Sequence, residues 1–499
     1  MTFRFGEDRL DTRTLYVQSM ERPGSYSLTD NGKARVKKFR DLVEAALGSG
    51  KTFYGINTGF GYLSDVRIED SKLARLQENL IRSHACGVGE NVDHEVVRAM
   101  LFLRAHTFSL GYSGISLECV ELIIAFLEHD ILPLVPSKGS VGASGDLAPL
   151  AHLALGLIGE GTVLHKGVKK TAAQALADSG LKAHVLGPKE GLSLINGTHY
   201  MSSLAAIAVE EAKILAVSAD IISALSLDAI RGTTKALDPR IHAIRPHQGQ
   251  AESAERISSL FHTADPILES HIDCGRVQDP YSFRCVPQVH GATHDTIRFV
   301  KTTVDTELNS VTDNPLCFEN GEILSGGNFH GQPLALAMDF LGIAMSELAS
   351  ISERRIEKLT NPNMSGLPAF LTRESGLNSG YMIPHVVAAA LVSENKVLSH
   401  PASVDSIPTS ADKEDHVSMG PIAANKCRRI LSNVSYVLAI ELLSACQGLD
   451  LLQPLEPNPA LKVIYDKVRS SIPKMDSDRS LSEDIERISE WILKGGLIE

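Results

Sequence analysis

Four long segments with apolar residues at helical spacing constrain the fold of this chain more than any other feature. They are residues 204–230, 333–360, 386–399 and 429–452. In the second segment, Pro333 suits the first turn of a helix, and the Asn361-Pro362 pair ends the apolar pattern. A helix of that length extends roughly 40 Å, and it needs partner helices to bury its apolar stripe. The sequence therefore predicts a mainly α-helical protein.

The residues before position 199 have a different sequence pattern from the rest of the chain. Their periodic pieces are shorter, and glycine-rich connections such as "YGINTGFGYL" from Tyr54 and "CGVGENV" from Cys86 separate them. We expect an N-terminal loop-rich helical domain over residues 1–198, followed by an elongated bundle of long helices over residues 199–499. The boundary lies in the short loop "NGTHY", where the first long helix begins.

Charge and cysteine usage restrict the classes of partner. The formal net charge is -12, and basic residues occur only in short pieces, so binding to nucleic acid or to an anionic membrane is not indicated. The apolar segment 204–230 contains Glu210, Glu211, Lys213 and Asp220, which would be costly inside a bilayer. The seven cysteines show no CxxC pair and no metal-ligand spacing. We expect a cytoplasmic protein without a metal site that acts on a small neutral or zwitterionic molecule.

The run "GSVGASGDLAP" at residues 139–149 is the most unusual local motif. A phosphate-binding loop would need a lysine after its last glycine, which this run lacks. A nucleophile elbow would need glycine two positions after Ser144, but Asp146 stands there. A simple turn, in which the glycines adopt positive φ, is the plain alternative.

A fourth interpretation of this run is chemical. In a tight bend, the amide nitrogen of Gly145 can attack the carbonyl carbon of Ala143, because glycine has no Cβ to block the approach. Loss of water from the ring, and then of the Ser144 hydroxyl as a second water, would leave a methylidene-imidazolone. This group is an electrophile, which no standard side chain provides.

The longer run "KGSVGASGDLAPLAH" resembles the signature of the aromatic amino acid ammonia-lyase family, whose members form that prosthetic group from Ala-Ser-Gly. Further blocks resemble the family in the same order over nearly the whole chain: "YGINTGFG", "SHACGVG", "LINGT", "VQDPYSFRC", "DNPL", "SGGNFHG", "ENKVLSHPASVDSIPTSADKEDHVSM" and "ACQGLDL". The resemblance implies an enzyme that removes ammonia and a β-proton from an amino acid. It also implies a homotetramer whose active sites draw on more than one subunit.

The resemblance assigns expected roles to residues outside the loop. Arg284 would pair with the substrate carboxylate, for which a guanidinium is suited, although an arbitrary arginine is more often in a structural ion pair. Tyr54 and Tyr281 are matched phenols, and either could act as a base only if its surroundings lower its pKa from about 10. Asn196 and Gln278 would donate hydrogen bonds near the amine and the prosthetic group.

Two further positions remain open between a functional and a structural role. Phe329 would form a wall of the pocket, or it is a core residue. Asp146 could move protons during cyclisation, but we favour the alternative that its side chain caps the helix beginning at Leu147.

Two markers point to the substrate. Family members acting on tyrosine or phenylalanine carry His-Leu or Phe-Leu where this chain has Ser83-His84, and the pair found here resembles members acting on histidine. Glu414 stands where relatives acting on phenylalanine tend to carry glutamine, and a carboxylate could accept an imidazole N–H or help transfer the β-proton. We therefore expect conversion of L-histidine to trans-urocanate and ammonia, with a tyrosine or phenylalanine ammonia-lyase or aminomutase as the alternative.

Four positions depart from the common pattern of the members acting on histidine, although none removes a catalytic group. They are His199, Phe283, Val286 and His290.

Overall fold

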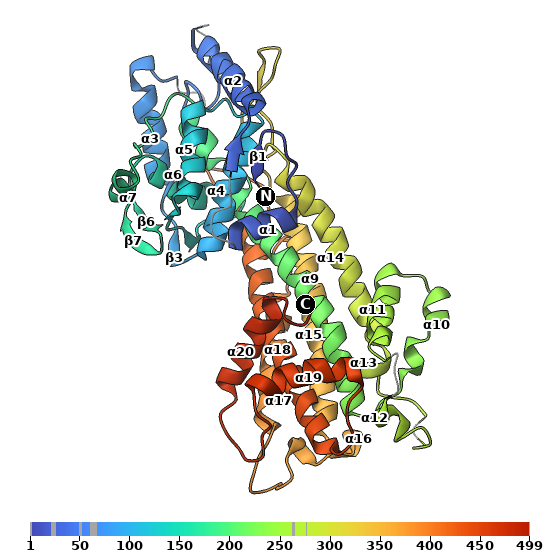
Figure 1. The fold of residues 1–499 in the computed structure, drawn as a ribbon. Coiled ribbons are helices and arrows are strands. Elements are labelled where there is room, and N and C mark those ends of the chain that lie inside the picture. The colour runs from blue at the N-terminus through green and yellow to red at the C-terminus, as the bar shows by residue number, and fades with distance from the viewer. Residues whose placement is uncertain are drawn as a thin grey trace. The chain divides into compact units, whose positions relative to one another are not determined.

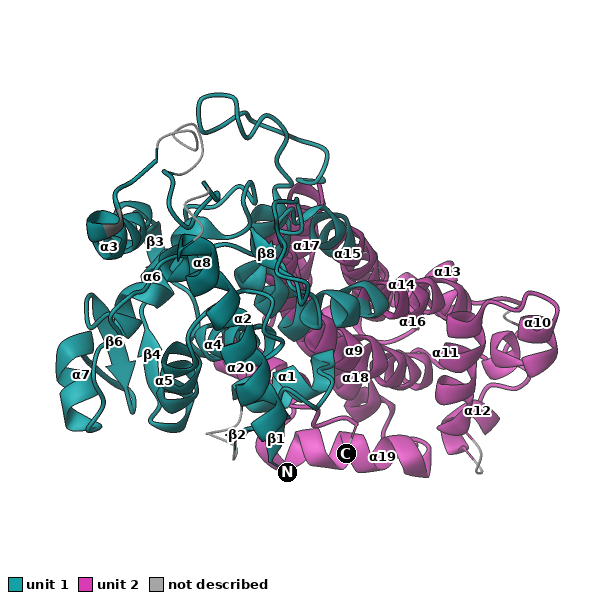
Figure 2. Ribbon diagram, turned by 90° about the horizontal axis from the view of Figure 1, so that it is seen from above, with its two compact units in different colours: residues 1–207, 301–339, 401–425 teal, residues 208–300, 340–400, 426–499 magenta. Residues whose placement is uncertain are grey.

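A computed structural model describes residues 2–20, 26–48, 52–59, 67–261, 265–275 and 277–498. As the sequence predicts, the described chain is mainly helical, and its strands are short (Figure 1). It divides into two compact units (Figure 2). Unit 1 comprises residues 1–207, 301–339 and 401–425, and unit 2 comprises residues 208–300, 340–400 and 426–499.

The first part of unit 1 consists of short helices connected by turns and small sheets. Its helices are α1 (Thr12–Met20), α2 (Asp30–Gly48), η2 (Asp70–Lys72), α3 (Leu73–His84), α4 (His94–Ser109), α5 (Leu117–Glu128), α6 (Leu147–Leu157), α7 (Ala172–Asp178) and α8 (Glu190–Ile195). Helix α6 contacts both α3 and α8, and α4 contacts α5. These contacts bring the start of α6, the end of α3 and the end of α8 together.

Small sheets hold the connections between these helices. Strand β1 (Phe3–Phe5) pairs in parallel with β2 (Tyr26–Leu28). Antiparallel pairs join β3 (Val88–Asn91) to β5 (Pro136–Lys138), β4 (Ile131–Pro133) to β6 (Thr162–His165), β6 to β7 (Val168–Thr171), and β8 (Leu316–Cys317) to β9 (Ile323–Leu324). Strand β5 is followed directly by the glycine-rich run, so the pairing of β5 with β3 fixes one end of that run.

The long helices confirm the main expectation from the sequence. Segments 204–230, 333–360, 386–399 and 429–452 correspond to α9 (His199–Ala229), α15 (Gln332–Thr360), α17 (Met382–Leu398) and α18 (Gly420–Leu452), and the first and third extend one residue past the helix end. Helix α15 begins one residue before Pro333 and ends before the Asn361-Pro362 pair, as expected. The division at residue 198 stays a prediction about domains, and it matches the start of α9. Helices α15 and α18 are long and apolar enough to cross a membrane by composition alone, but 61% and 83% of their most apolar windows are buried, as in core helices.

Unit 2 includes most of one long helix that the sequence did not indicate, α14 (Val286–Leu308), whose residues from Lys301 onward belong to unit 1. Its threonines are β-branched and Gly291 lies within it, so its intrinsic helix propensity is low, and it is less apolar overall than α9, α15 and α18. The remaining elements of the unit are η3 (Thr234–Leu237), α10 (Pro239–Ala243), α11 (Gln248–Ser259), α12 (Pro266–Glu269), α13 (Tyr281–Arg284), α16 (Pro362–Ser365), η4 (Ala369–Leu371), α19 (Pro459–Ser471) and α20 (Ser482–Leu493).

Buried charges connect the long helices within unit 2. Arg355 of α15 and Glu441 of α18 form a fully buried ion pair, with Nε to Oε1 at 2.5 Å and Nη2 to Oε2 at 2.8 Å. His290 of α14 lies between Arg355 and the buried carboxylate of Asp220 on α9. Because each charge has a partner, these helices tolerate ionised groups in their core.

Candidate functional site

A cavity of about 680 Å³ in unit 1 brings together most of the residues expected at the active site. Those that line it are Tyr54, His84, Ala143, Ser144, Asn196, Phe329 and Glu414. They come from positions far apart in the sequence, including the end of α3, the glycine-rich run before α6 and the residue after α8. The cavity therefore joins the loop to two of the predicted polar partners, His84 and Glu414.

Glycine is required at the bends of the loop. Gly142 and Gly145 have φ of +68° and +73°, in the left-handed region that disfavours other residues. A Cβ on Gly145 would lie 2.2 Å from the carbonyl oxygen of Gly197, and one on Gly142 would lie 2.2 Å from Oγ of Ser418. The loop is thus bent on both sides of Ala143 and Ser144, against the Ser418 side chain at Gly142 and the Gly197 backbone at Gly145, which leave no room for a Cβ.

Hydrogen bonds hold this bend from several directions. The amide of Asp146 donates to the Gly197 carbonyl at 2.8 Å, and Nδ2 of Asn196 donates to the Ser144 carbonyl at 2.8 Å. Ser140 Oγ donates to the Gly145 carbonyl at 3.1 Å, and it accepts from the Gly142 amide. The conformation of residues 140–146 is therefore imposed by the fold.

The loop fits the proposed self-modification. Among the described residues, none donates to the Ala143 carbonyl, and the Gly145 amide donates to none. These are the two groups that would form the ring, so no hydrogen bond has to break before they approach. The side chain that would leave, Ser144 Oγ, donates to Oε1 of Glu414 at 2.6 Å.

Glu414 and His84 give the cavity its polar character. Oε2 of Glu414 accepts from Thr409 Oγ1 at 2.7 Å, which fixes the carboxylate. Nδ1 of His84 lies 2.8 Å from the Leu80 carbonyl, which can only accept, so Nδ1 carries the proton. Burial lowers the pKa of His84 from its usual value. The neutral ring therefore has its lone pair on Nε2.

Asp146 differs from the expectation that its side chain caps the helix starting at Leu147. Asp146 occupies the N-cap position of α6 but makes no side-chain cap bond there. Its Oδ2 accepts instead from the amides of Tyr200 and Met201, each at 3.0 Å, at the start of α9. The favoured interpretation was wrong because the free amides of a second helix lie within reach. Burial raises the pKa of Asp146 to about 7.

Four expected residues do not line this cavity: Gly145, which follows Ser144 in the loop, and Gln278, Tyr281 and Arg284. Gln278, Tyr281 and Arg284 lie in unit 2, in and before the short helix α13. Tyr281 is 70% exposed, and the guanidinium carbon of Arg284 lies 4.7 Å from the centre of its ring. The four residues that depart from the common family pattern also lie outside the cavity. The side chains of His199, Phe283, Val286 and His290 are all buried, and none of the four lines the cavity.

The structure adds residues that sequence reasoning missed. Eleven further residues line the cavity: Leu80, Leu147, Leu192, Ile195, Asn314, Ser325, His330, Ser410, Lys413, Asp415 and His416. Most of them lie within or beside the sequence blocks that resemble the family, so membership of such a block was the feature that could have identified them as site residues. Thr409, which fixes Glu414, lies in such a block as well.

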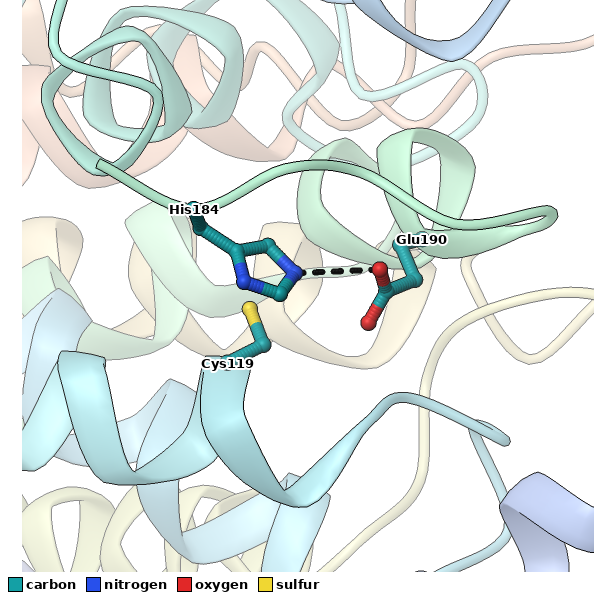
Figure 3. Close-up of side chains that lie close together, drawn as sticks. All are labelled: Cys119, His184 and Glu190. Carbon is teal, nitrogen blue, oxygen red and sulfur yellow. Dashed lines mark hydrogen bonds and ion pairs between the residues drawn. The ribbon is translucent and has the colours of Figure 1, made fainter. Parts of the chain in front are cut away.

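Cys119, His184 and Glu190 are the described residues whose ligand atoms lie close enough to suggest a metal, within 4.8 Å of one another (Figure 3). The Glu190 carboxylate is already occupied, since Oε2 accepts from His184 Nε2 at 3.0 Å and from the Gly187 amide, and Oε1 accepts from the Ser116 amide. These bonds lower its pKa to about 2 although burial opposes them. The carboxylate therefore has a structural role, since its bond from the Ser116 amide holds α8 to the start of α5.

Comparisons with known proteins agree with the geometry. A family model described as aromatic amino acid lyase matches residues 15–470. The histidine ammonia-lyase of Homo sapiens is 52% identical over 492 residues, which cover 98% of this chain and 75% of that protein. The crystal structure of histidine ammonia-lyase from Trypanosoma cruzi has a TM-score of 0.92 at 43% identity and covers 100% of this chain and 94% of that one. The tyrosine aminomutase of Streptomyces globisporus has a TM-score of 0.94 at 36% identity, with coverage of 100% and 98%.

Proposed function

The chain belongs to the aromatic amino acid lyase family, and we propose that it is a histidine ammonia-lyase that converts L-histidine to trans-urocanate and ammonia. The observation that carries this proposal is that Ser144, Glu414 and His84 line one cavity. An imidazole has two nitrogens that need polar partners, and a carboxylate and a neutral histidine provide them. A phenyl ring in the same place would offer no hydrogen bond to Nε2 of His84, nor to Oε1 of Glu414 once the Ser144 hydroxyl is lost, which is costly for these half-buried groups.

The prosthetic group would come from Ala143, Ser144 and Gly145, with no metal or external cofactor. When formed, it supplies an electrophile that makes the substrate amine a better leaving group. The chain's own residues hold this group in place: Nδ2 of Asn196 binds the Ser144 carbonyl, and Gly197 lies against Gly145. Oδ1 of Asn196 is buried and has no partner among the described residues, so it is available to accept from the substrate amine.

Glu414 and His84 are the residues that we expect to contact the imidazole. The lone pair of His84 Nε2 can accept a ring N–H, and the Glu414 carboxylate can accept another proton, from the ring or from the β-carbon. Tyr54 lines the same cavity and is the phenol that we place there as the alternative proton acceptor. Phe329 supplies an apolar wall against which the substrate ring can lie.

Arg284, the expected anchor for the substrate carboxylate, does not line this cavity. We propose that Arg284, with Tyr281 and Gln278, completes the cavity of a different copy of the chain in a cytoplasmic homotetramer. Tyr281 is largely exposed. Nε of Arg284 is buried and has no hydrogen-bond partner among the described residues. Both observations support a role for these two residues outside unit 2. A planar guanidinium fits a carboxylate by two parallel hydrogen bonds.

The alternative function within the family is a lyase or aminomutase that acts on tyrosine or phenylalanine. The structural similarity to a tyrosine aminomutase is the reason to test it. Purified enzyme offered L-histidine, L-tyrosine and L-phenylalanine separately distinguishes the two. We expect ammonia and a new conjugated chromophore from histidine, and little from the others. Release of ammonia from tyrosine but not from histidine would overturn the assignment of the substrate.

A further inference from the structure

Arg104 of α4 is a fully buried cation close to the modified loop. Its side chain has no accessible surface, and burial lowers its pKa only to about 10, so it stays charged near neutral pH. Nη2 donates to the Asn196 carbonyl at 2.9 Å, while Nε and Nη1 have no partner within the described ranges. No described carboxylate forms an ion pair with it, although Asp146 and Asp313 attract it from a distance. The guanidinium carbon also lies 5.3 Å from the centre of the Phe108 ring, a cation–π contact. A buried cation without an ion-pair partner is costly, so its one hydrogen bond among the described residues, to Asn196, is informative.

That contact is to the segment that shapes the loop. Asn196 donates through Nδ2 to the Ser144 carbonyl, and the next residue, Gly197, accepts from the Asp146 amide and lies against Gly145. The residues on both sides of the bend therefore depend on the position of the Asn196–Gly197 segment. Arg104 holds the carbonyl between these two residues.

We propose that Arg104 is a positioning residue for formation of the prosthetic group: by holding the Asn196 carbonyl, it keeps the Asn196–Gly197 segment where residues 143–145 must bend to cyclise. This inference rests on the proposed function, because it requires that the group forms. In the reaction, the Gly145 nitrogen bonds to the Ala143 carbonyl carbon, whose oxygen leaves as water with the amide protons of Gly145 and Ser144, and a C=N bond forms between that carbon and the Ser144 nitrogen. The Ser144 hydroxyl then leaves with the α-proton as a second water, so no oxidant or co-reactant is needed.

The test compares the full-length variants Arg104→Met, Arg104→Gln and Arg104→Lys with the wild-type chain, which keeps Arg104. Intact mass gives the fraction of chains lighter by two waters, and the absorbance of the conjugated group gives an independent measure. We expect the neutral variants to fold but to cyclise about 100-fold more slowly, since that is the scale of a misplacement near 1 Å. Lysine keeps the charge and one donor, so Arg104→Lys should recover part of the yield.

Arg98 provides a matched control on the same helix. It is also buried, and it donates to the Ser19 carbonyl at 2.6 Å and pairs with Asp130 at 2.9 Å, away from the loop. Arg98→Met should lower stability yet leave every chain lighter by two waters. A cyclisation defect in Arg98→Met equal to that in Arg104→Met would overturn the inference, because any buried arginine would then serve.

The outcomes separate the inference from the function on which it rests. If the wild-type chain is not lighter by two waters, the proposed prosthetic group is wrong. At least one of the three Arg104 variants has to fold and stay soluble. If that variant and the wild-type chain both cyclise fully and at equal rates, only the role of Arg104 is wrong. A soluble variant with mostly uncyclised chains, next to a fully cyclised Arg98→Met, supports the inference.

Discussion

Ser144 Oγ and Glu414 Oε1 lie 2.6 Å apart, joined by a hydrogen bond between residues 270 positions apart in the chain. The bond places the hydroxyl that would be lost in forming the prosthetic group next to a carboxylate that Thr409 fixes from the other side. The same carboxylate lines the cavity with His84. Glu414 therefore faces both the loop that we propose to be modified and the space where the substrate would bind.

Replacing Glu414 by glutamine tests its part in the reaction. Glutamine can still accept from Ser144, so the chain should still become lighter by two waters. It cannot accept a proton, so kcat with L-histidine should fall by about 10²- to 10⁴-fold. Steady-state rates of ammonia release check this, with Glu322→Gln in an exposed turn as the control. An unchanged kcat would remove Glu414 from the mechanism.

Sharing of active sites between copies can be tested by mixing inactive variants. Ser144→Ala and Arg284→Met each remove one part of the site, and mixed oligomers should recover activity if those parts come from different chains. Ser144→Ala mixed with Glu414→Gln is the matched control, because both residues line one cavity of one chain and cannot complement each other. Equal failure of both mixtures would contradict a shared site.

Asp146 predicts a dependence of stability on pH. Its pKa in the folded chain is about 7, above the usual value of 3.8, because of burial. From about pH 4 to about pH 7 the folded chain keeps a proton that the unfolded chain loses, so this carboxyl loses its stabilising contribution as the pH rises. Each unit of pKa shift corresponds to about 1.4 kcal/mol.

The variant Asp146→Asn isolates this effect, since its side-chain oxygen can still accept from Tyr200 and Met201 at the start of α9. The free energy of unfolding, measured by denaturant from about pH 4 to about pH 8, should favour the variant increasingly as the pH rises. A difference that does not change with pH would show that the carboxyl titrates normally.

The buried pair of Arg355 and Glu441 predicts a large effect on stability. Arg355→Met leaves the Glu441 carboxylate buried without its cation, which should lower the free energy of unfolding by about 3 to 5 kcal/mol. The neighbouring Arg354 is the control, since its side chain is 56% exposed and its loss should cost about 1 kcal/mol or less. Denaturant titration of both variants checks the prediction, and equal small losses would contradict it.

The sequence predicted the helical class because it is encoded locally: the apolar spacing of residues 333–360 defines α15. The bend at Ala143-Ser144-Gly145 could also be predicted from its glycines, whereas the chemistry of these three residues stays a proposal. Contacts between distant residues could not be predicted in this way. Arg104 bonds to a residue 92 positions away, and Asp146 caps α9 instead of its own helix, because only the packed chain brings those groups within reach.

The mass of the peptide that contains residues 139–149 tests the central claim most directly. Fragmentation of this peptide from the purified protein should locate the loss of two waters at Ala143, Ser144 and Gly145. The same peptide from Ser144→Ala should have its full mass, and that variant should lose activity on the order of 10³-fold or more. An unmodified peptide from enzyme that releases ammonia from L-histidine would contradict the account.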